Sequence, residues 1–282
     1  MQFEQFAKAH GVLVDRVRPV SRIQRCPTAE HPRSKNGAWF WDGNRGWVSA
    51  WDNGGEIIWF NDPNAKPWTE ADKRAWADKR RVQRSEEDRR HEQAAHRATE
   101  ILRSCTVSEH GYLRLKGVGS VKTLVTPDDD LFVPMRSLQS NDLMGAQIIH
   151  WDDVERKWSK KMIPGMRAKG AVLRLGQKHA AETFLCEGYA TGLSIEMALI
   201  LTRLDASVLV CFSDSNLVHV APMVSGRAYV FADNDESGAG ERAAKASGLP
   251  YCMSDVVGED ANDLHAREGI YVVSAKLMKV RQ

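Results

Sequence analysis

Three carboxylates stand directly after short apolar segments in the last third of the chain. Glu187 follows the segment 183–186, and Asp233 and Asp235 follow the segment 228–232 in an Asp-x-Asp pattern. Carboxylates that share a pocket repel one another and raise one another's pKa. A divalent cation removes this repulsion, and Mg2+ needs only one or two protein carboxylates beside water and substrate phosphates. The three acids therefore predict a site for Mg2+ or Mn2+.

The elements around these acids predict how they would meet. Four apolar runs are expected to form strands, at residues 183–186, 208–212, 228–232 and 250–253. Helices are expected at about 190–203 and 238–247. Short apolar runs followed by helices are typical of a parallel sheet that is covered on both faces. Ligands bind beyond the carboxyl ends of such strands, so the acids are expected at one edge of the sheet.

The alternative interpretation is a set of surface acids at loop tips and helix N-termini. Asp-x-Asp is common, and a motif match of this kind carries a high risk of being false. Two glycines favour the metal site. Gly188 and Gly238 flank the acids, and a glycine leaves room for a phosphate or a shell of water to approach the backbone.

Three segments resemble the motifs of the Toprim family, in the order and with the spacing found in plasmid and phage primases. Residues 184–191 resemble the first motif, residues 230–238 the Asp-x-Asp motif, and residues 258–264 the acidic stretch that follows. Residues 213–217 also stand where those primases carry an Asp-x-x-Asn-Leu turn. Together the segments indicate a Toprim domain.

Upstream segments resemble the primase-core half that precedes the Toprim domain in plasmid and phage primases. They are residues 111–118, 131–135 and 145–148. Residues 131–135 and 143–149 are also expected to pair as a hairpin, because a polar turn separates them. The resemblance therefore covers about residues 106 to 264.

The resemblance implies a role for each acid. Asp233 and Asp235 would bind metal, and Glu187 would be a metal ligand or a general acid/base, so these three are the predicted catalytic residues. Asp260 is a further candidate metal ligand that would act through water. Asp263 is expected to cap or pack near the following helix.

The implied activity is that of a DNA primase, with single-stranded DNA as template and NTPs as substrates. Primer synthesis is phosphoryl transfer, in which metal ions neutralise charge and hold the reacting groups in line. The sequence contains no GKS or GKT phosphate loop, so an ATP-driven motor is not expected, and unwinding would need a separate replicative helicase. Two alternatives remain open: a Toprim nuclease, or a non-catalytic module that binds nucleic acid or regulates.

Composition divides the chain into four predicted parts. They are an aromatic and basic N-terminal module at residues 1–61, a long charged helical linker at 62–105, a mixed α+β primase-core subdomain at 106–181, and a Toprim domain with a Rossmann-like parallel sheet at 182–282. The expected fold class is accordingly α/β. The linker is predicted to be helical because no Pro or Gly interrupts residues 70–104 and its charges alternate in sign.

The N-terminal module stands where primases carry a zinc ribbon. It contains Cys26 and His31 but no later CxxC pair, and structural zinc sites use four ligands, so zinc is not expected. Its tryptophans, with basic side chains between them, predict either the core of a small β module or a surface on which unpaired bases stack. Most of these rings are expected to be buried, and one or two to be exposed.

A basic stretch from Arg156 to Lys178 stands where similar primases contact template and nucleotide. The candidates for binding triphosphate or template backbone are Lys160, Lys161, Arg167 and Lys169. The alternative interpretation is an ordinary solvated loop.

Overall composition limits the classes of protein that fit. Of the 282 residues 43% are hydrophobic and the net charge is +2, which favours a packed core over wholesale disorder. The longest apolar stretch, near residues 197–201, is far shorter than the roughly 20 residues that span a bilayer, so no membrane is expected. No secretory signal is expected, and five scattered cysteines without a CxxC pair indicate reduced thiols and a cytoplasmic protein.

Overall fold

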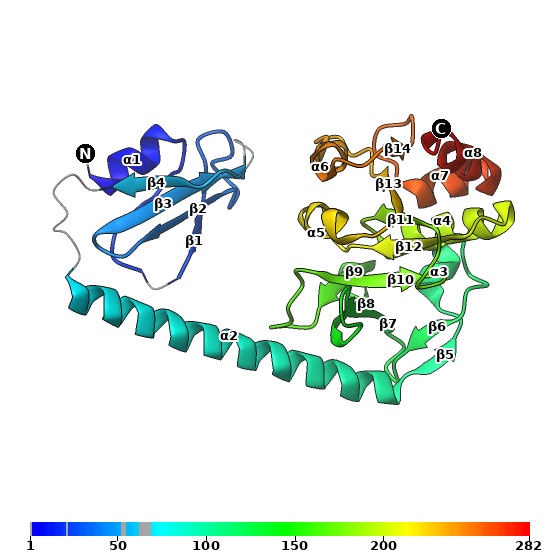
Figure 1. Cartoon of the computed structure of the whole chain (residues 1–282), viewed down its shortest axis with the longest axis horizontal. Coiled ribbons are helices and arrows are strands. Elements are labelled where there is room, and N and C mark those ends of the chain that lie inside the picture. The colour runs from blue at the N-terminus through cyan, green and yellow to red at the C-terminus, as the bar shows by residue number, and fades with distance from the viewer. Residues whose placement is uncertain (1, 21, 52–54, 62–68) are drawn as a thin grey trace. The chain divides into compact units, whose positions relative to one another are not determined.

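The structure of the chain is a computed structural model that describes residues 2–20, 22–51, 55–61 and 69–282 (Figure 1). The chain divides into two compact units, residues 1–80 (unit 1) and residues 81–282 (unit 2). The boundary lies within helix α2 (Glu70–Ser104). This helix confirms the long helix predicted from the sequence. Residues 62–68 of the predicted linker lie outside the described residues.

Before α2, the described residues of unit 1 form one short helix and one antiparallel sheet. The helix is α1 (Phe3–Ala9), and the strands pair in the order β1 (Gln24–Cys26), β2 (Gly37–Trp41), β3 (Arg45–Ala50) and β4 (Ile58–Asn61). Helix α1 packs on one face of this sheet, where the ring of Phe3 stacks 5.0 Å from the ring of Trp41. Large aromatic side chains therefore fill the core of this small unit.

Unit 2 is built around one sheet of ten strands. Its first half comprises β5 (Thr106–Ser108), α3 (Gly111–Leu115), β6 (Thr123–Val125), β7 (Leu131–Ser137), β8 (Leu143–Asp152), β9 (Lys157–Met162) and β10 (Ala171–Leu175). Its second half comprises β11 (Glu182–Cys186), α4 (Tyr189–Thr202), β12 (Ala206–Val210), α5 (Asp214–Val220), the 3-10 helix η2 (Ala221–Met223), β13 (Arg227–Ala232), α6 (Ala239–Ser247), β14 (Tyr251–Met253), α7 (Ala261–Glu268) and α8 (Ile270–Val280).

The second half of unit 2 confirms the parallel sheet expected from the apolar runs. Strands β14, β13, β11 and β12 lie side by side in that order and all run parallel. Helices α4, α7 and α8 lie on one face of these strands and α5 and α6 on the other (Figure 1). All five residues of β11 are buried, as expected for a strand that is covered on both sides.

Strand β10 joins the two halves of unit 2 into one sheet. It pairs antiparallel with β12 on one side and with β7 on the other. The predicted hairpin of β7 and β8 is also antiparallel, and β9 extends it. The predicted division at residue 181 thus falls inside a continuous sheet and remains a prediction.

Two local expectations were wrong or incomplete. Residues 111–115 of the predicted α+β subdomain form α3, where the backbone N–H of Tyr112 donates to the side chain of His110. The second strand of the Toprim region ends at Val210 instead of residue 212, because Phe212 has a left-handed φ of 64°. The end of α2 is more than a connector, since Ala94 and Ala98 are fully buried against Phe132 and neighbouring apolar residues.

Candidate metal centre at the carboxyl edge of the sheet

The predicted acids leave the sheet at the same edge. Strands β11 and β13 are parallel neighbours, with Phe184 opposite Tyr229 and Leu185 opposite Val230. Glu187 follows the last residue of β11 directly, and Asp233 follows the last residue of β13. Strand β12 lies on the other side of β11, and the chain beyond it also reaches this edge.

Asp233 is the acid that has an unpartnered carboxylate oxygen. Its Oδ1 atom is buried and, among the described residues, has no hydrogen-bond partner. Burial raises the pKa of Asp233 to about 8, and the charges of neighbouring acids contribute to the rise. Those neighbours are Asp260, Glu187, Asp214 and Asp235. A buried carboxylate in this position lacks a positive partner.

Asp235, two residues later, is in the opposite state. Its Oδ1 accepts hydrogen bonds from the Ser237 hydroxyl and from the backbone N–H of Ala239, and its Oδ2 accepts one from the N–H of Gly240 at 2.7 Å. Burial raises the pKa of Asp235, but these hydrogen bonds outweigh it and the pKa falls to about 2. Asp235 is therefore ionised and fixed at the start of α6.

Gly240 explains how α6 can approach the acids so closely. A Cβ atom at this position would lie 2.2 Å from the backbone oxygen of Asp233, a distance that real structures do not tolerate. Gly188, one of the two glycines expected to keep the turns slim, would meet the Thr191 hydroxyl at 2.9 Å. Gly240 was not singled out from the sequence, although it follows the Asp-x-Asp pattern in the same short segment.

Glu187 shares its position with an acid that sequence analysis did not include in the site, Asp214. Burial raises the pKa of Glu187 to about 7, followed in importance by the charge of Asp214 and a side-chain hydrogen bond with it. The charge of Asp235 adds to the rise and that of Lys160 opposes it. Two carboxyl groups can form such a hydrogen bond only if one of them holds a proton.

The backbone after β12 brings Asp214 to this position. The N–H of Cys211 donates to the carbonyl of Cys186 at 2.8 Å, and the N–H of Phe212 donates to the carbonyl of Glu187 at 2.9 Å. The chain then turns through Phe212 into α5, where Asp214 is the first residue. The resemblance at residues 213–217 was a signal for this turn.

Asn216 fixes the same turn from within. It is buried, and its Nδ2 group donates to the carbonyls of Ala171 and Cys211, both at 2.8 Å. Its Oδ1 accepts a hydrogen bond from the N–H of Gly170 at 2.8 Å. This side chain therefore ties the turn before α5 to the loop that precedes β10.

Asp260 lies near the cluster, but other contacts occupy its carboxylate. Its Oδ1 accepts from the N–H groups of Asn262 and Asp263, and its Oδ2 accepts from the Thr191 hydroxyl at 2.8 Å. Asp263 in turn accepts from the N–H of Asp260, which completes a capping box at the start of α7. Asp263 thus has the capping position expected for it, and a role of Asp260 in metal binding remains a prediction.

The four basic candidates do not lie together. Lys160 is on β9, its charge lowers the pKa of Glu187, and its Nζ atom lies 5.5 Å from the centre of the Tyr112 ring. Lys161 follows it in the same strand, so its side chain projects from the opposite face. Arg167 and Lys169 are exposed in the loop between β9 and β10. Of the four, only Lys160 is placed near the acids by its effect on them.

Cys26 and His31, the residues considered for zinc, differ in their surroundings. Cys26 is packed in the apolar cluster of unit 1, and burial raises the pKa of its thiol to about 11. His31 is exposed. Burial in an apolar core disfavours the thiolate that a metal ligand must provide.

The acids fit a hydrated divalent cation better than a metal enclosed by protein. Within the described part of the chain, no three His, Cys, Asp or Glu side chains form a group that could hold a metal as they stand. Mg2+ does not need such a group, because it keeps several waters and binds one or two carboxylates. The unpartnered oxygen of Asp233 offers one ligand, and ionised Asp235 offers a second.

The structure also bears on the expected absence of a membrane segment. Among the helices that the structure describes, none is long and apolar enough to cross a bilayer.

Comparisons with known proteins support the assignment of this region. The Toprim domain family model matches residues 182–270, and no curated protein matches the chain. The chain is similar, at 15% identity and a TM-score of 0.37, to a chain in a structure of bacteriophage T7 lagging-strand DNA polymerase interacting with primase domains of two gp4 subunits bound to an RNA/DNA hybrid and dTTP. That similarity covers 54% of this chain and 76% of the other. The family match and the acids at the carboxyl edge of a parallel sheet identify residues 182–270 as a Toprim domain.

Proposed function

We propose that this chain is a DNA primase that makes short oligonucleotides on single-stranded DNA by metal-dependent nucleotidyl transfer, in phage or plasmid replication. One observation carries the proposal: a buried, unpartnered carboxylate oxygen of Asp233 at an edge where Glu187, Asp214 and Asp235 converge. A fold gains nothing from four such acids unless something positive binds among them. The substrate phosphates of a nucleotidyltransferase would share that cation.

The proposed roles follow from the state of each acid. A divalent cation, when bound, would neutralise charge and align the reacting phosphate. Asp235 is ionised at neutral pH and held by α6, so it suits a permanent ligand. Asp233 would become a ligand by losing its proton. Glu187, with a pKa of about 7, can hold or release a proton near neutral pH, which suits a general acid/base.

The first half of unit 2 supports a primase over a nuclease. Strand β10 continues the Toprim sheet into β7, and the hairpin of β8 and β9 brings Lys160 toward Glu187. A cation there would face the triphosphate of an NTP. Lys161, Arg167 and Lys169 would contact the phosphates of the template strand, to which basic side chains bind without reading sequence. Duplex unwinding would come from a separate helicase.

Incubation of the full chain with single-stranded DNA, NTPs and Mg2+ or Mn2+ tests the proposal. We expect new labelled oligonucleotides that disappear in EDTA and in the Asp233→Ala variant. The matched control is Glu236→Gln, an exposed acid in the same turn that stays active. Shortened template would indicate a nuclease instead, and a mobility shift without either product would indicate a binding module.

A further inference from the structure

A small pocket in unit 2 is lined by three cations and, among the described residues, by no acid. Its volume is about 280 Å3, and residues of the turn between β7 and β8, of strand β10 and of the segment after β10 line it. The cations are Arg136, Arg174 and Lys178, and we call this site the basic pocket. Like charges that gather in one place repel one another, so the arrangement weakens the fold unless an anion binds there.

The two arginines of the basic pocket project from the same face of the sheet. Arg136 on β7 lies directly opposite Val172 on β10, and Arg174 is two residues further along β10. Residues directly opposite each other, and residues two apart in one strand, share a face. Diagonal neighbours in an antiparallel pair are about 7–8 Å apart, which is within reach of long side chains. Both guanidinium groups can therefore contact one small anion.

This face is not the one from which Lys160 approaches the metal centre. Val172 belongs to the apolar cluster that includes Leu217 of α5. Lys160 lies opposite Ile149 on β8, and Ile149 belongs to the cluster on the other side of the sheet, with residues of α3 and α4. The residues that line the basic pocket also include none of the acids of the metal centre. The two sites are therefore separate.

Arg174 is half-buried, yet within the described ranges it has no carboxylate partner. One of its Nη atoms donates to the Ser207 hydroxyl at 2.7 Å. Burial lowers the pKa of its guanidinium, because a charge that is partly removed from water loses hydration. Arg136 donates to the backbone carbonyl of Asn141 at 3.1 Å. Since a guanidinium has several N–H donors, both arginines keep donors for an anion.

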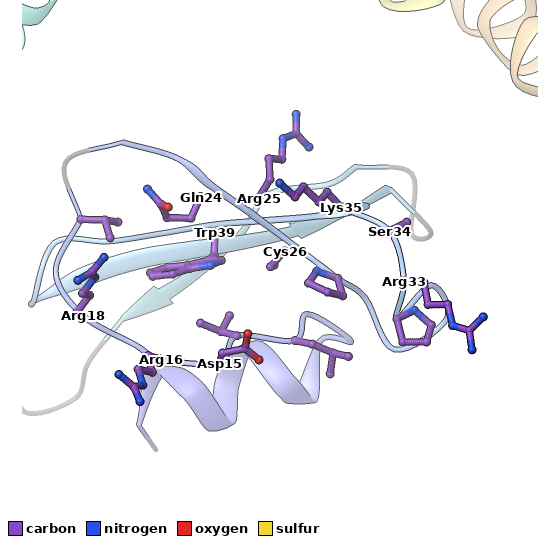
Figure 2. A pocket seen from close by; sticks show the side chains of 15 residues that line it. Asp15, Arg16, Arg18, Gln24, Arg25, Cys26, Arg33, Ser34, Lys35 and Trp39 are labelled. Carbon is purple, nitrogen blue, oxygen red and sulfur yellow. The ribbon is translucent and has the colours of Figure 1, made fainter. Parts of the chain in front are cut away.

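The cations of a larger groove in unit 1 are arranged differently. Figure 2 shows Arg18, Arg25 and Arg33 around that groove, with side chains that point in different directions. All three are exposed, so water can solvate them, and Asp15 also lines the groove. The basic pocket of unit 2 differs because one of its cations is half-buried, where hydration is incomplete.

The size of the basic pocket favours a small anion. Pockets for drug-sized ligands begin at about 300 Å3. A volume of about 280 Å3 therefore suits two or three linked phosphate groups better than a whole nucleotide. The Ser137 hydroxyl accepts a hydrogen bond from the N–H of Ser140 at 3.2 Å, so its own proton remains available to a phosphate oxygen. Guanidinium groups bind phosphate through paired N–H donors, which makes phosphate the best match among common anions.

We propose that the basic pocket binds pyrophosphate or another short polyphosphate anion, held by Arg136, Arg174 and Lys178. The bound anion would neutralise the three cations and would link the end of β7 to β10. Binding needs no metal ion at the carboxyl edge of the sheet. The proposal therefore stands whether or not the chain is a primase.

Isothermal titration calorimetry of the full chain with sodium pyrophosphate, in metal-free buffer of low ionic strength, tests the proposal. Arg174→Gln and Arg136→Gln should each raise Kd about tenfold. This change corresponds to about 1.4 kcal/mol, near the lower end of what a hydrogen bond to a charged group contributes. Arg174→Lys should have an intermediate Kd, because lysine keeps the charge but not the paired donors.

The matched control is Arg18→Gln, which removes one exposed cation from the groove of unit 1. This variant should bind pyrophosphate as the parent chain does. Pyrophosphate should raise the Tm of the parent and of Arg18→Gln more than that of Arg174→Gln, since a ligand stabilises the folded chain that binds it. Circular dichroism would show that each variant is folded. Asp233→Asn should bind pyrophosphate normally, so loss of primer synthesis and loss of this binding can be told apart.

Three results would overturn the proposal. The first is a parent chain that does not bind pyrophosphate. The second is equal affinity of the folded Arg174→Gln, Arg136→Gln and Arg18→Gln chains, which would leave an adventitious ion only. The third is binding of an oligothymidylate that depends on Arg174 while binding of pyrophosphate does not, which would assign the basic pocket to a nucleic-acid strand.

Discussion

Strand β11 carries a glutamate at each end, and the two are held in opposite states. Glu182, its first residue, is 3% exposed and accepts hydrogen bonds from the guanidinium of Arg281 at 2.6 and 2.9 Å, with Arg227 2.6 Å away. These hydrogen bonds lower the pKa of Glu182. Glu187, directly beyond the last residue, is half-buried beside Asp214, and its pKa is raised to about 7.

The difference separates acids that complete the fold from acids that await a ligand. At the amino edge of the sheet, the charge of Glu182 has two positive partners within the chain, Arg227 and Arg281. At the carboxyl edge several acids lie together, and the charge of Lys160 lowers the pKa of Glu187. The Oδ1 atom of Asp233 has no hydrogen-bond partner among the described residues. Groups with strongly perturbed pKa values gather at functional sites, because folding by itself does not require them.

The largest expected effect separates the two edges by activity. Asp233→Asn should reduce primer synthesis by about a hundredfold or more, because loss of groups that only support a metal ligand already costs roughly 10–100-fold. Arg281→Gln, at the amino edge, should leave primer synthesis within about twofold at a temperature where the chain is folded. Initial rates at saturating Mg2+ measure both. Comparable losses in the two variants would break the comparison.

The second effect separates the edges by stability. Arg281→Gln leaves the buried Glu182 short of two hydrogen bonds and should lower the free energy of unfolding by about 2 kcal/mol. The pKa of Glu182 is lowered from 4.5 in the folded chain, so the stability that this carboxylate adds is present above pH 4.5 and is lost as the pH falls below it. Denaturant unfolding should therefore show a smaller difference between variant and parent in acid than at pH 7.

The third effect has the opposite sign of pH dependence. A carboxyl group with a raised pKa in the folded chain weakens the fold at higher pH, because the unfolded chain releases its proton more readily. For Asp233 this loss should grow from its ordinary value of 3.8 up to about pH 8. Asp233→Asn in EDTA should then be more stable than the parent at pH 8 by more than about 1.4 kcal/mol, the equivalent of one pKa unit.

Magnesium sharpens this third prediction. The ion binds ionised carboxylate, so it should stabilise the parent chain more at pH 8 than at pH 6 and should have little effect on Asp233→Asn. The charges of the neighbouring acids contribute to this pH dependence, because they raise the pKa of Asp233. These acids are Asp260, Glu187, Asp214 and Asp235. Glu236→Gln serves as the control, because Glu236 is exposed in the same turn. A parent chain whose stability rises between pH 5 and pH 8 in EDTA would contradict the prediction.

Sequence patterns located the edge of the sheet because strand ends are visible in a sequence. An apolar run that stops at a carboxylate, as at Glu187 and Asp233, fixes both the strand and the direction in which its acid leaves. The buried core of unit 2 was predictable for the same reason. The long helix α2 was predictable from the absence of Pro and Gly.

The order of strands could not be predicted in this way, and most of the missing detail depends on it. Asp214 belongs to the site only because β12 is the neighbour of β11, which no local pattern shows. The pKa values of Asp233 and Asp235 differ because backbone N–H groups at the start of α6 donate hydrogen bonds to Asp235, whereas burial raises the pKa of Asp233. Tertiary contacts, more than residue types, determine the protonation states of Asp233 and Asp235.

The smallest expected effect concerns Lys160, the cation near Glu187 at the carboxyl edge of the sheet. The charge of Lys160 lowers the pKa of Glu187, so Lys160→Gln should raise that pKa further. Primer synthesis should fall about fivefold near pH 7 and recover at higher pH if Glu187 must be ionised, since a general base works best near its own pKa. Lys157→Gln, an exposed lysine on the same strand, is the control. A uniform loss at every pH would mean that Lys160 contacts only substrate phosphate, whereas an upward shift of the pH profile ties it to Glu187.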